Sequence, residues 1–482
     1  MKIFNTLTRQ IEEFKPISSP EVKFYACGPT VYDFAHIGHL RKYTMDDILL
    51  KVLEKDGYQV KFVQNVTDVG HLASDADTGE DKLEKGAKKY KQDVWAIAQK
   101  FEDYFYRSME LMGNRKPDIS CKATEHIDQM RKMVERLEEK GYTYVIEGDG
   151  VYYDSSKFPD YSKLANLNLE EMMEGARVEK VEGKRNPTDF ALWKFERPGE
   201  NRAMVWLSKW HPRSFPGWHI ECSAMSMEYL GEQLDIHTGG IDHIPVHHTN
   251  EIAQSEAVTG KKPFSRYWVH HNFLVVDGEK MSKSKENFYT IDDVLKKGFE
   301  PMALRLLFLG AHYRSELNFT WKSLQGAQKA WERLKKMISS ISISSKKDFD
   351  QNDLSVEGRR YYRQFFTKIN DDLNTPEALA IFWQVTKNET ISLEEKQFLL
   401  FEFDSIFGLG LSDIDFGSAE KNLLKKDLPT NVQQLLDQRA GARRDRDFTL
   451  ADNLRNELAI RGYRVVDKED EQLVFMGKLS IN

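Results

Sequence analysis

Residues 21–29 read EVKFYACGP, and within them Val22, Phe24 and Ala26 share one face of a strand that ends in a Gly-Pro turn. Apolar residues then recur at helical spacing, at Met45, Ile48, Leu49, Val52 and Leu53. A second strand candidate, VKFV, follows at residues 60–63. A strand, a helix and a strand within about forty residues predict a βαβ unit and therefore a parallel sheet. Ligands of such sheets bind beyond the carboxyl ends of the strands, where Cys27 and its turn lie.

The composition sets the class of protein. With 482 residues the chain is too long for one hydrophobic core, so we expect about two to four domains. Apolar residues make up 40% and charged residues 30%, the balance of a soluble globular protein. No apolar run approaches a membrane span and the N-terminus lacks the core of a secretory signal, so we expect a cytoplasmic protein without membrane association. The net charge of −7 argues against a protein that coats nucleic acid, but it allows basic patches that hold a folded RNA.

Other patterns divide the rest of the chain. One long amphipathic helix is predicted from about residue 81 to residue 112, and residues 142–154 predict a β-hairpin. The stretch 116–198 is rich in turns and charge and reads as an insertion, after which the sheet is expected to resume near Trp206. From about Trp321 the chain is predicted to be mainly helical. Its end is predicted to hold one helix and two strands, at 450–458, 463–466 and 472–475.

Two short motifs have the chemistry of a phosphate site. His36-Ile37-Gly38-His39 lies where a strand turns into a helix, and such a turn offers backbone N–H groups and the positive end of the helix dipole. Residues 278–284, GEKMSKS, place two lysines on a loop that can close over a triphosphate. Each motif alone also fits a plainer interpretation, an ordinary helix entry or a solvated lysine-rich loop.

Together the two motifs resemble the signature of class I aminoacyl-tRNA synthetases. The resemblance implies a Rossmann-type sheet on which ATP and an amino acid form an aminoacyl-adenylate, with Mg²⁺ accompanying the ATP. It implies that four side chains stabilise the phosphates in the transition state, namely those of His36, His39, Lys280 and Lys283. The ATP-binding positions it implies are Pro29, Gly38, His39, Met281, Ser282, Lys283 and Ser284. Because the amino acid carboxylate attacks the α-phosphate directly, the protein has to position and neutralise the reactants.

Three separate segments carry residue types that bind metals. Cys27 ends the first strand, Cys222 lies in the segment GWHIECSAM, and His247 and Glu251 share one face of a predicted helix. Two thiolates, an imidazole and a carboxylate suit Zn²⁺. The chain has only 3 cysteines, widely spaced, which is no disulfide framework. Burial of Cys222 as a small apolar side chain and simple hydrogen bonding of the His-His pair are equally compatible with the spacing.

These segments resemble the three zinc-binding segments of the cysteinyl-tRNA synthetase family. The resemblance implies that Cys27, Cys222, His247 and Glu251 bind one zinc ion that recognises the sulfur of L-cysteine. Zinc binds a thiolate strongly but a serine hydroxyl poorly, so the metal would separate two near-isosteric amino acids without an editing domain. Further positions that match the amino acid pocket of the family are Thr30, Thr67, Trp218, His237 and Asp242. Trp218 also fits a plain core residue.

The chain departs from the pattern of the family at several positions near this site. The departures are Thr238, Val246 and Thr249, and the histidines His71 and His271. Both ATP motifs and all four proposed ligands are present, so the departures concern loop geometry rather than the reaction. His71, His248 and His271 are additional histidines, so the number of metal ligands is open.

The RNA end completes the expected organisation. Residues 371–379 and 439–448 resemble the helical anticodon-side domain and the terminal module of the family, and Arg439, Arg443 and Arg444 suit contacts with tRNA(Cys), although a solvated helix face fits equally. The fold class expected is α/β: a Rossmann-type catalytic domain with an inserted subdomain, then a helical bundle and a small mixed α/β module. The domain bounds expected are 1–115 with 199–300, 116–198, 301–425 and 426–482. We expect a monomer.

Two other functions fit parts of the pattern. A ligase that joins cysteine to a small amine shares the zinc and ATP motifs but lacks a full anticodon end, so the helical region and Arg443-Arg444 argue against it. An inactive RNA-binding or zinc-binding regulator on the same fold is disfavoured by the intact ATP motifs.

Overall fold

The structure is a computed structural model. It describes residues 1–70, 82–166, 182–282, 285–342, 349–414, 425, 428–445, 447–461, 463–468 and 471–476. The chain forms two compact units, one of residues 1–337 with 344–412 and one of residues 338–343 with 413–482, and each is considered by itself. In the described part of the chain, no helix is both long and apolar enough to cross a membrane.

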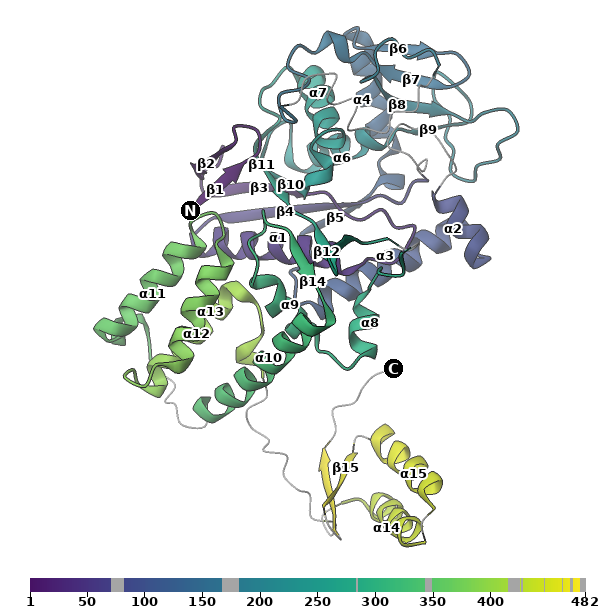
Figure 1. The fold of residues 1–482 in the computed structure, drawn as a ribbon. Helices are drawn as coiled ribbons and strands as arrows, with labels where there is room; N and C mark the ends of the chain where they lie inside the picture. The colour runs from purple at the N-terminus through teal and green to yellow at the C-terminus, as the bar shows by residue number, and fades with distance from the viewer. Residues whose placement is uncertain are drawn as a thin grey trace. The chain divides into compact units, whose positions relative to one another are not determined.

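A five-stranded sheet, with every strand parallel to its neighbours, organises the first unit. Its strand order is β11-β10-β3-β4-β5. The strands span Glu21–Ala26 (β3), Gln59–Val66 (β4), Ile119–Lys122 (β5), Leu234–Gly240 (β10) and Ser265–His271 (β11). Helix α1, Ile37–Lys55, connects β3 to β4, so the predicted βαβ unit and the parallel sheet are confirmed. Figure 1 shows α1 running beneath this sheet.

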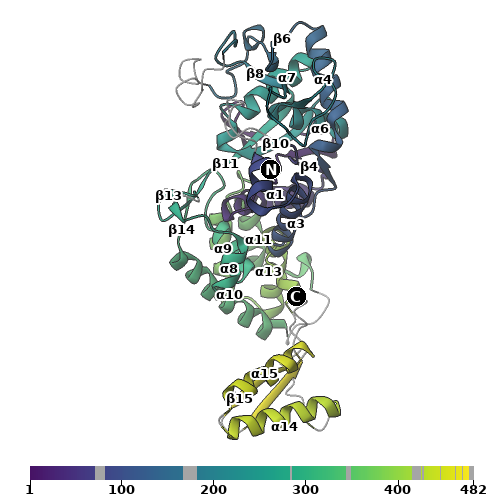
Figure 2. The same ribbon diagram turned by 90° about the vertical axis from the view of Figure 1, so that its right-hand side faces the viewer.

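Helices cover both faces of the sheet, which buries its apolar strands (Figures 1 and 2). Helix α1 and helix α3, Val94–Leu111, lie on one face. On the other face lie α4, Ile127–Glu139, α6, Trp218–Leu230, and α7, His247–Thr259. Almost every residue of α7 is buried, polar ones included, so this helix is part of the interior rather than an amphipathic surface helix.

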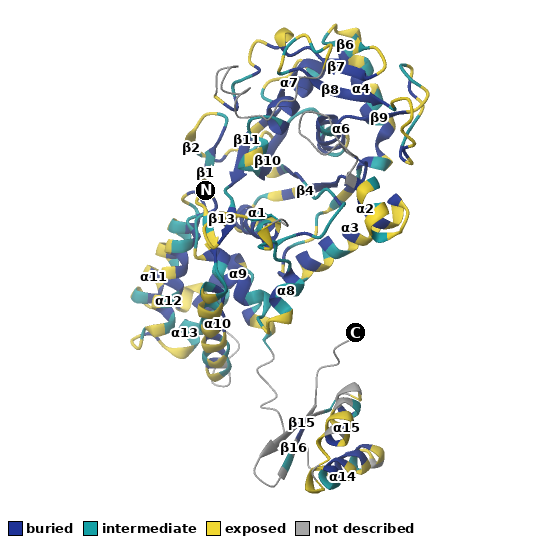
Figure 3. Cartoon of the chain, turned by 45° about the vertical axis from the view of Figure 1, so that its right-hand side comes forward, coloured by how far each residue is buried: buried dark blue, intermediate teal, exposed yellow. Residues whose placement is uncertain are grey.

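A four-stranded antiparallel sheet packs against α4 and α6, on the side of these helices away from the parallel sheet (Figure 1). Its strands are β6, Thr143–Ile146, β7, Gly150–Tyr153, β8, Phe190–Phe195, and β9, Ser214–Pro216. Strands β6 and β7 are the predicted hairpin, and every residue of β8 is buried (Figure 3). The strand pairing differs from expectation at two points. Strand β5 lies within the predicted insertion, 116–198, but belongs to the parallel sheet. Trp206, where the parallel sheet was expected to resume, bridges to Ser214 instead, and the parallel sheet resumes at β10.

The single helix predicted from about residue 81 to residue 112 is wrong. Two helices stand there, α2, Lys82–Tyr90, and α3. Lys91 adopts a left-handed backbone conformation with φ 52°, which ends the first helix. The side chain of Asp93 then accepts hydrogen bonds from the N–H groups of Trp95 and Ala96 and starts the second helix. The continuous apolar stripe concealed this capping signal.

The later part of the first unit is helical, as predicted from Trp321 onward. Its helices are α8, Ile291–Lys296, α9, Pro301–Leu309, α10, Trp321–Ser342, whose residues 338–342 count with the second unit, α11, Val356–Ile369, α12, Thr375–Lys387, and α13, Leu393–Phe407. Buried Arg305 of α9 ties this bundle to the sheet domain, because it donates to the Phe407 and Met112 carbonyls and pairs with Asp47 of α1. A two-stranded sheet pairs β1, Lys2–Asn5, with β2, Gln10–Glu13. A three-stranded sheet has the strand order β13-β12-β14, with β13 at Glu279–Lys280, β12 at Leu274–Val276 and β14 at Leu317–Phe319. Short 3₁₀ turns span Ala123–Glu125, Ser155–Lys157, Ile241–His243, Gln351–Asp353 and Leu411–Asp413.

The second unit is a small α/β module. Helices α14, Thr430–Arg444, and α15, Phe448–Ile460, pack beside a hairpin of β15, Tyr463–Lys468, and β16, Glu471–Met476. Its core includes Leu436, Leu458 and Val474. The predicted order of a helix and two strands at the end of the chain is confirmed, and the strands pair with each other.

Candidate metal centre and nucleotide site

The carboxyl ends of β3 and β10 bring the predicted site residues together. Cys27 follows β3, and His237 lies within β10 beside it. The backbone of Gly28 approaches the β4 end so closely that a Cβ there would lie 1.6 Å from the Asn65 carbonyl oxygen. Only glycine fits this turn, which therefore holds Cys27 at the sheet edge where α/β proteins bind ligands.

The four proposed metal ligands converge although they come from three distant segments. One ligand atom each from Cys27, Cys222, His247 and Glu251 lies within 4.8 Å of all the others. Cys27 Sγ is 3.7 Å from Cys222 Sγ and 3.9 Å from Glu251 Oε1, and His247 Nε2 is 3.0 Å from the same oxygen. Such separations suit a four-coordinate divalent ion placed among the atoms.

Burial and charge make this cluster unusual. All four side chains are buried, and burial raises the pKa of the Cys27 thiol. The hydrogen bond with Cys27 raises the pKa of Cys222 well above its usual range, and burial raises it further. Burial alone would raise the pKa of Glu251, but His237 and His247 outweigh it and hold that pKa at about 2. Protonated thiols beside a carboxylate become thiolates readily when a divalent cation binds, so the donor set fits zinc.

Other buried groups orient these ligands. His219 Nδ1 lies 3.0 Å from His247 Nδ1, and His237 Nε2 lies 2.9 Å from Glu251 Oε2. The Tyr161 hydroxyl donates to the side-chain oxygen of Asn250, which lies on α7 beside Glu251. Partners of this kind fix the ring orientation and the basicity of metal ligands.

The predicted amino acid pocket is partly assembled. Thr30 bridges to Thr67, whose hydroxyl donates to Glu221 at 2.8 Å. The Trp218 ring lies 4.5 Å from the His247 ring, so it covers a proposed metal ligand rather than sitting in an ordinary core. His237 is fully buried, whereas Asp242 is exposed near the end of β10. Of this group, Trp218 and His237 lie against proposed metal ligands.

His36 and His39 form the start of α1. His36 Nδ1 accepts hydrogen bonds from the N–H groups of Gly38 and His39, and His39 Nδ1 accepts one from the His36 N–H. Burial lowers the pKa of His36 well below its usual range, and His39 beside it lowers it further. A neutral ring that accepts at Nδ1 carries its proton on Nε2. Both rings, stacked with centroids 3.7 Å apart, therefore present an Nε2–H donor.

The two phosphate motifs meet in space. A Cβ on Gly38 would lie 2.8 Å from Met281 Cε, so glycine here lets the lysine loop approach the helix start. The Ile37 N–H donates to the Tyr289 carbonyl, and the His36 ring packs edge-on to Phe288 at 5.1 Å.

The structure describes part of the remaining predicted ATP residues. Lys280 lies on β13, and the Ser282 N–H donates to Asn287. Lys283 and Ser284 lie outside the described residues. Pro29 accepts from the Thr67 N–H.

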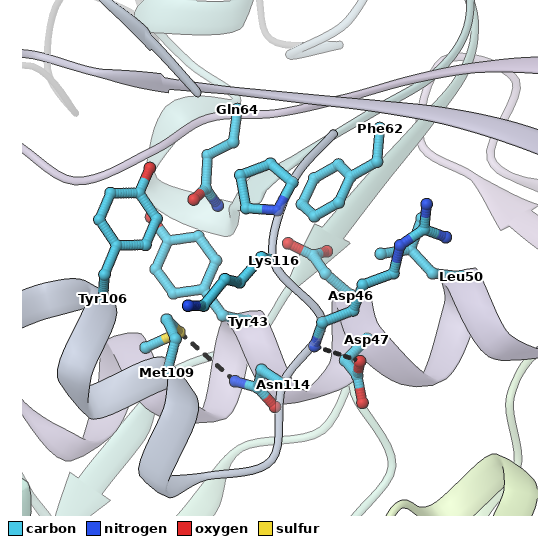
Figure 4. A pocket seen from close by; sticks show the side chains of 12 residues that line it. Tyr43, Asp46, Asp47, Leu50, Phe62, Gln64, Tyr106, Met109, Asn114 and Lys116 are labelled. Carbon is cyan, nitrogen blue, oxygen red and sulfur yellow. Dashed lines mark hydrogen bonds between the residues drawn. The ribbon is translucent and has the colours of Figure 1, made fainter. Parts of the chain in front are cut away.

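A small pocket lies near this site, and none of the predicted site residues lines it. Figure 4 shows it between α1, β4 and α3, with Tyr43, Asp46 and Tyr106 on its walls. Asp46 nevertheless reaches the site, because it pairs with His271 Nε2 at 2.8 Å and with Lys42 at 2.8 Å. Lys42 in turn donates to the Cys27 carbonyl. The pocket wall therefore supports the strand end that carries Cys27.

Sequence reasoning missed this support. In the sequence His271 is only an additional histidine, and no motif gives Asp46 a role. The available signal was a charged residue, Asp46, among the apolar positions of a predicted buried helix, since such a residue needs a partner. Of the other departures, the Thr249 hydroxyl donates to the Ile244 carbonyl, whereas the Thr238 hydroxyl is buried without a hydrogen-bond partner among the described residues. His71 lies outside the described residues.

The three arginines of the second unit differ in exposure. Arg443 and Arg444 are exposed at the end of α14. Arg439 is only 1% exposed, and its Nη1 donates to Gln472 on β16 at 2.6 Å. Arg439 therefore connects α14 to β16 inside this module. Because its guanidinium is buried, it offers no surface for contact with RNA.

Comparisons with known proteins agree along almost the whole chain. The family model for the tRNA synthetases class I (C) catalytic domain matches residues 13–329, and that for the cysteinyl-tRNA ligase anticodon binding domain matches residues 425–474. A cysteine–tRNA ligase of Treponema denticola is 43% identical over 97% of this chain and 98% of its own. One of Burkholderia lata is 43% identical, covering 98% and 97% respectively.

Solved structures agree at the level of the fold. A methionyl-tRNA synthetase of Mycobacterium tuberculosis bound by methionyl-adenylate aligns with a TM-score of 0.56 and 13% identity, covering 89% of this chain and 96% of that one. A leucyl synthetase of Agrobacterium radiobacter in a ternary complex with tRNA aligns with a TM-score of 0.59 and 13% identity, covering 84% and 86%. At this identity the likeness concerns the fold alone, and it matches the class I architecture expected.

Proposed function

The chain belongs to the family of cysteine–tRNA ligases, and we propose that it selects its amino acid by binding the substrate thiolate to zinc held by Cys27, Cys222, His247 and Glu251. The reaction of the family is ATP-dependent: cysteine is activated as cysteinyl-adenylate with release of pyrophosphate, and the cysteine then passes to the 3′ end of the tRNA. The observation that carries the zinc proposal is the convergence of the four donor atoms within 4.8 Å.

The chemistry of these donors supports the choice of metal and its role. Two sulfurs, an imidazole nitrogen and a carboxylate oxygen suit Zn²⁺ better than Mg²⁺ or Ca²⁺, which prefer oxygen. A bound zinc ion would supply a position that takes a thiolate and rejects a hydroxyl. The metal is therefore the element of specificity, and activation of the carboxylate belongs to other residues.

For the ATP reaction we propose His36, His39, Lys280 and Lys283 as the groups that stabilise the phosphates. The two Nε2–H donors lie at the start of α1, where the helix dipole is positive, an arrangement suited to phosphate oxygens. Contact between Gly38 and Met281 supports closure of the lysine loop over the same nucleotide. The further ATP positions proposed are Pro29, Ser282 and Ser284, and Mg²⁺ accompanies the ATP.

For the amino acid we propose that Thr30, Thr67, Trp218, His237 and Asp242 surround the substrate. Trp218 lies over the proposed ligand His247, so its ring would close the pocket around a small side chain. Exposed Asp242 at the strand end suits the ammonium group of a free amino acid, whose charge it would neutralise. These roles follow from position and charge.

For the tRNA we propose the helical region 301–425 as the part that contacts the stem and residues 426–482 as the part that contacts the anticodon. The connective insertion in the catalytic domain, expected over residues 116–198, then begins after β5 and extends to β9. The match to an anticodon-binding model over residues 425–474 favours tRNA(Cys) over a small amine as acceptor. Arg443 and Arg444 are the proposed contacts, and Arg439 is set aside because it is buried. We further propose a cytoplasmic monomer.

Replacing Arg443 and Arg444 together by alanine is expected to raise the KM for tRNA(Cys) about tenfold. The slope of the logarithm of the binding constant against the logarithm of the salt concentration should become shallower by about two, because each arginine would neutralise one phosphate. Exchange of pyrophosphate into ATP with cysteine should be unchanged. The measurement is tRNA charging at several salt concentrations beside the exchange assay.

The matched control is Arg461→Ala, since Arg461 lies in the same module, directly after α15, and pairs with Glu457 of that helix. It should charge tRNA normally. An unchanged KM in the double variant would remove the two arginines from the tRNA site. Exchange without any charging by the unaltered protein would instead favour the small-amine ligase.

A further inference from the structure

A second group of donor atoms overlaps the proposed metal site. One ligand atom each from Cys27, His237, His248 and Glu251 also lies within 4.8 Å of all the others, and all four side chains are buried. This group shares Cys27 and Glu251 with the first and replaces Cys222 and His247 by two imidazoles. One thiolate, two imidazoles and one carboxylate form a donor set that zinc and cobalt bind well.

The two shared residues face both groups at once. Glu251 Oε1 lies 3.0 Å from His247 Nε2, while its Oε2 lies 2.9 Å from His237 Nε2. Cys27 Sγ lies 3.7 Å from Cys222 Sγ and 3.4 Å from His248 Nε2. Cys27 and Glu251 are therefore common to both groups, and Glu251 Oε1 also lies 3.8 Å from His248 Nε2.

The ring of His248 is oriented by outer hydrogen-bond partners, as the rings of metal-binding histidines are. Its Nδ1 lies 2.7 Å from His270 Nε2, and His270 Nδ1 lies 2.7 Å from the Thr6 hydroxyl. This buried chain fixes the ring so that Nε2 faces Cys27, which is how outer partners orient ligating histidines. A Cβ on Gly239 would come within 2.3 Å of the His248 ring, so a glycine at that position makes room for it.

His237 is positioned by ring stacking rather than by an outer hydrogen-bond partner. Its ring stacks on Trp268 with centroids 4.5 Å apart and planes 17° apart, which fixes its orientation. Its Nδ1 is buried and has no hydrogen-bond partner among the described residues, so Nε2 is the atom committed to Glu251. Stacking on Trp268 and the contact with Glu251 restrict the rotation of this imidazole ring.

We propose that Cys27, His237, His248 and Glu251 form a second, overlapping site for a borderline divalent cation, which keeps the ion in the protein when Cys222 is lost. The inference rests on the proposed metal site. With two thiolates the first set makes an anionic complex and binds a soft cation more strongly, so it holds the ion in the unaltered protein. With one thiolate the second set makes a neutral complex, which is less costly to bury.

The test uses the full chain loaded with Co²⁺, in which sulfur-to-metal charge-transfer absorbance reports how many thiolates bind the ion. We expect Cys222→Ala to retain about one ion per chain with roughly half the charge-transfer absorbance of the unaltered protein, since one thiolate remains. His248→Ala alone should retain the ion with full absorbance. Cys222→Ala combined with His248→Ala should bind Co²⁺ at least tenfold more weakly than Cys222→Ala, because both sets are then incomplete.

Each contrary result has a separate meaning. Loss of the ion from Cys222→Ala alone, or equal retention with and without His248, would overturn the second site while leaving the first intact. An unaltered protein that binds no Co²⁺ or Zn²⁺ would overturn the proposed metal site itself. His247→Ala, with and without His248→Ala, repeats the comparison on the other unshared ligand, and thermal unfolding of each variant shows that it is folded.

Discussion

Replacing His39 by alanine is expected to slow cysteine-dependent exchange of pyrophosphate into ATP by about 10²- to 10³-fold in kcat. His39 Nδ1 is occupied by the His36 N–H, so its Nε2–H is the donor that faces solvent at the start of α1. Removal of a pre-positioned donor to the developing phosphate charge raises the barrier of the activation step rather than weakening ground-state binding. The measurement is the exchange rate at saturating ATP and cysteine.

Two further variants separate chemistry from structure. His39→Asn keeps a side-chain donor near the same place and should recover part of the lost rate. His211→Ala removes an imidazole whose Nδ1 lies 2.7 Å from the Arg213 carbonyl, in a surface loop outside the site, and should exchange at the normal rate. A rate for folded His39→Ala within about threefold of the unaltered rate would contradict the role given to this side chain, since a lost donor should cost far more.

Replacing Cys27 by serine is expected to weaken zinc binding at least a hundredfold and to raise the KM for cysteine in the exchange reaction by a similar factor. Cys27 is the sulfur shared by both donor sets, so its loss leaves neither complete. A neutral hydroxyl is a poor substitute because it ionises far less readily than a thiol. The measurement is zinc content after dialysis against a competing chelator, together with exchange kinetics.

Cys121 offers a matched control for this change. It is buried to the same degree as Cys27, and its Sγ donates weakly to the Gln64 carbonyl at 3.6 Å, outside the donor cluster. Cys121→Ser should therefore keep its zinc and its KM for cysteine. Zinc retained by Cys27→Ser as firmly as by Cys121→Ser would rule out both donor sets.

Much of the fold could be predicted because its signals are local. The βαβ unit shows in the alternation of residues 21–26 and in the helical spacing that follows, and the hairpin shows in its turn. The break at Lys91 was missed because an apolar stripe runs through it while the decisive cap, Asp93, is a single polar residue. The true return of the parallel sheet at β10 was missed because strand pairing depends on contacts far along the chain.

The site was harder to predict for the same reason. No spacing rule joins Cys27, Cys222 and Glu251, so the donor set came from resemblance, and the structure now places these atoms near one another. The second set and the His248–His270–Thr6 chain involve side chains brought together only by folding. The burial of Arg439 likewise follows from packing of α14 on the β15–β16 hairpin, which charge composition alone does not reveal.

The most direct test of metal-based selection is the absorbance of the Co²⁺-loaded protein as amino acid is added. Binding of a substrate thiolate to the ion should increase the sulfur-to-metal charge-transfer absorbance, which should reach half of its maximum at the cysteine concentration that half-saturates the exchange reaction. Serine at the same concentrations should leave the spectrum unchanged. A spectrum that stays constant while cysteine is activated would contradict the account, because the substrate sulfur would then be recognised without the metal.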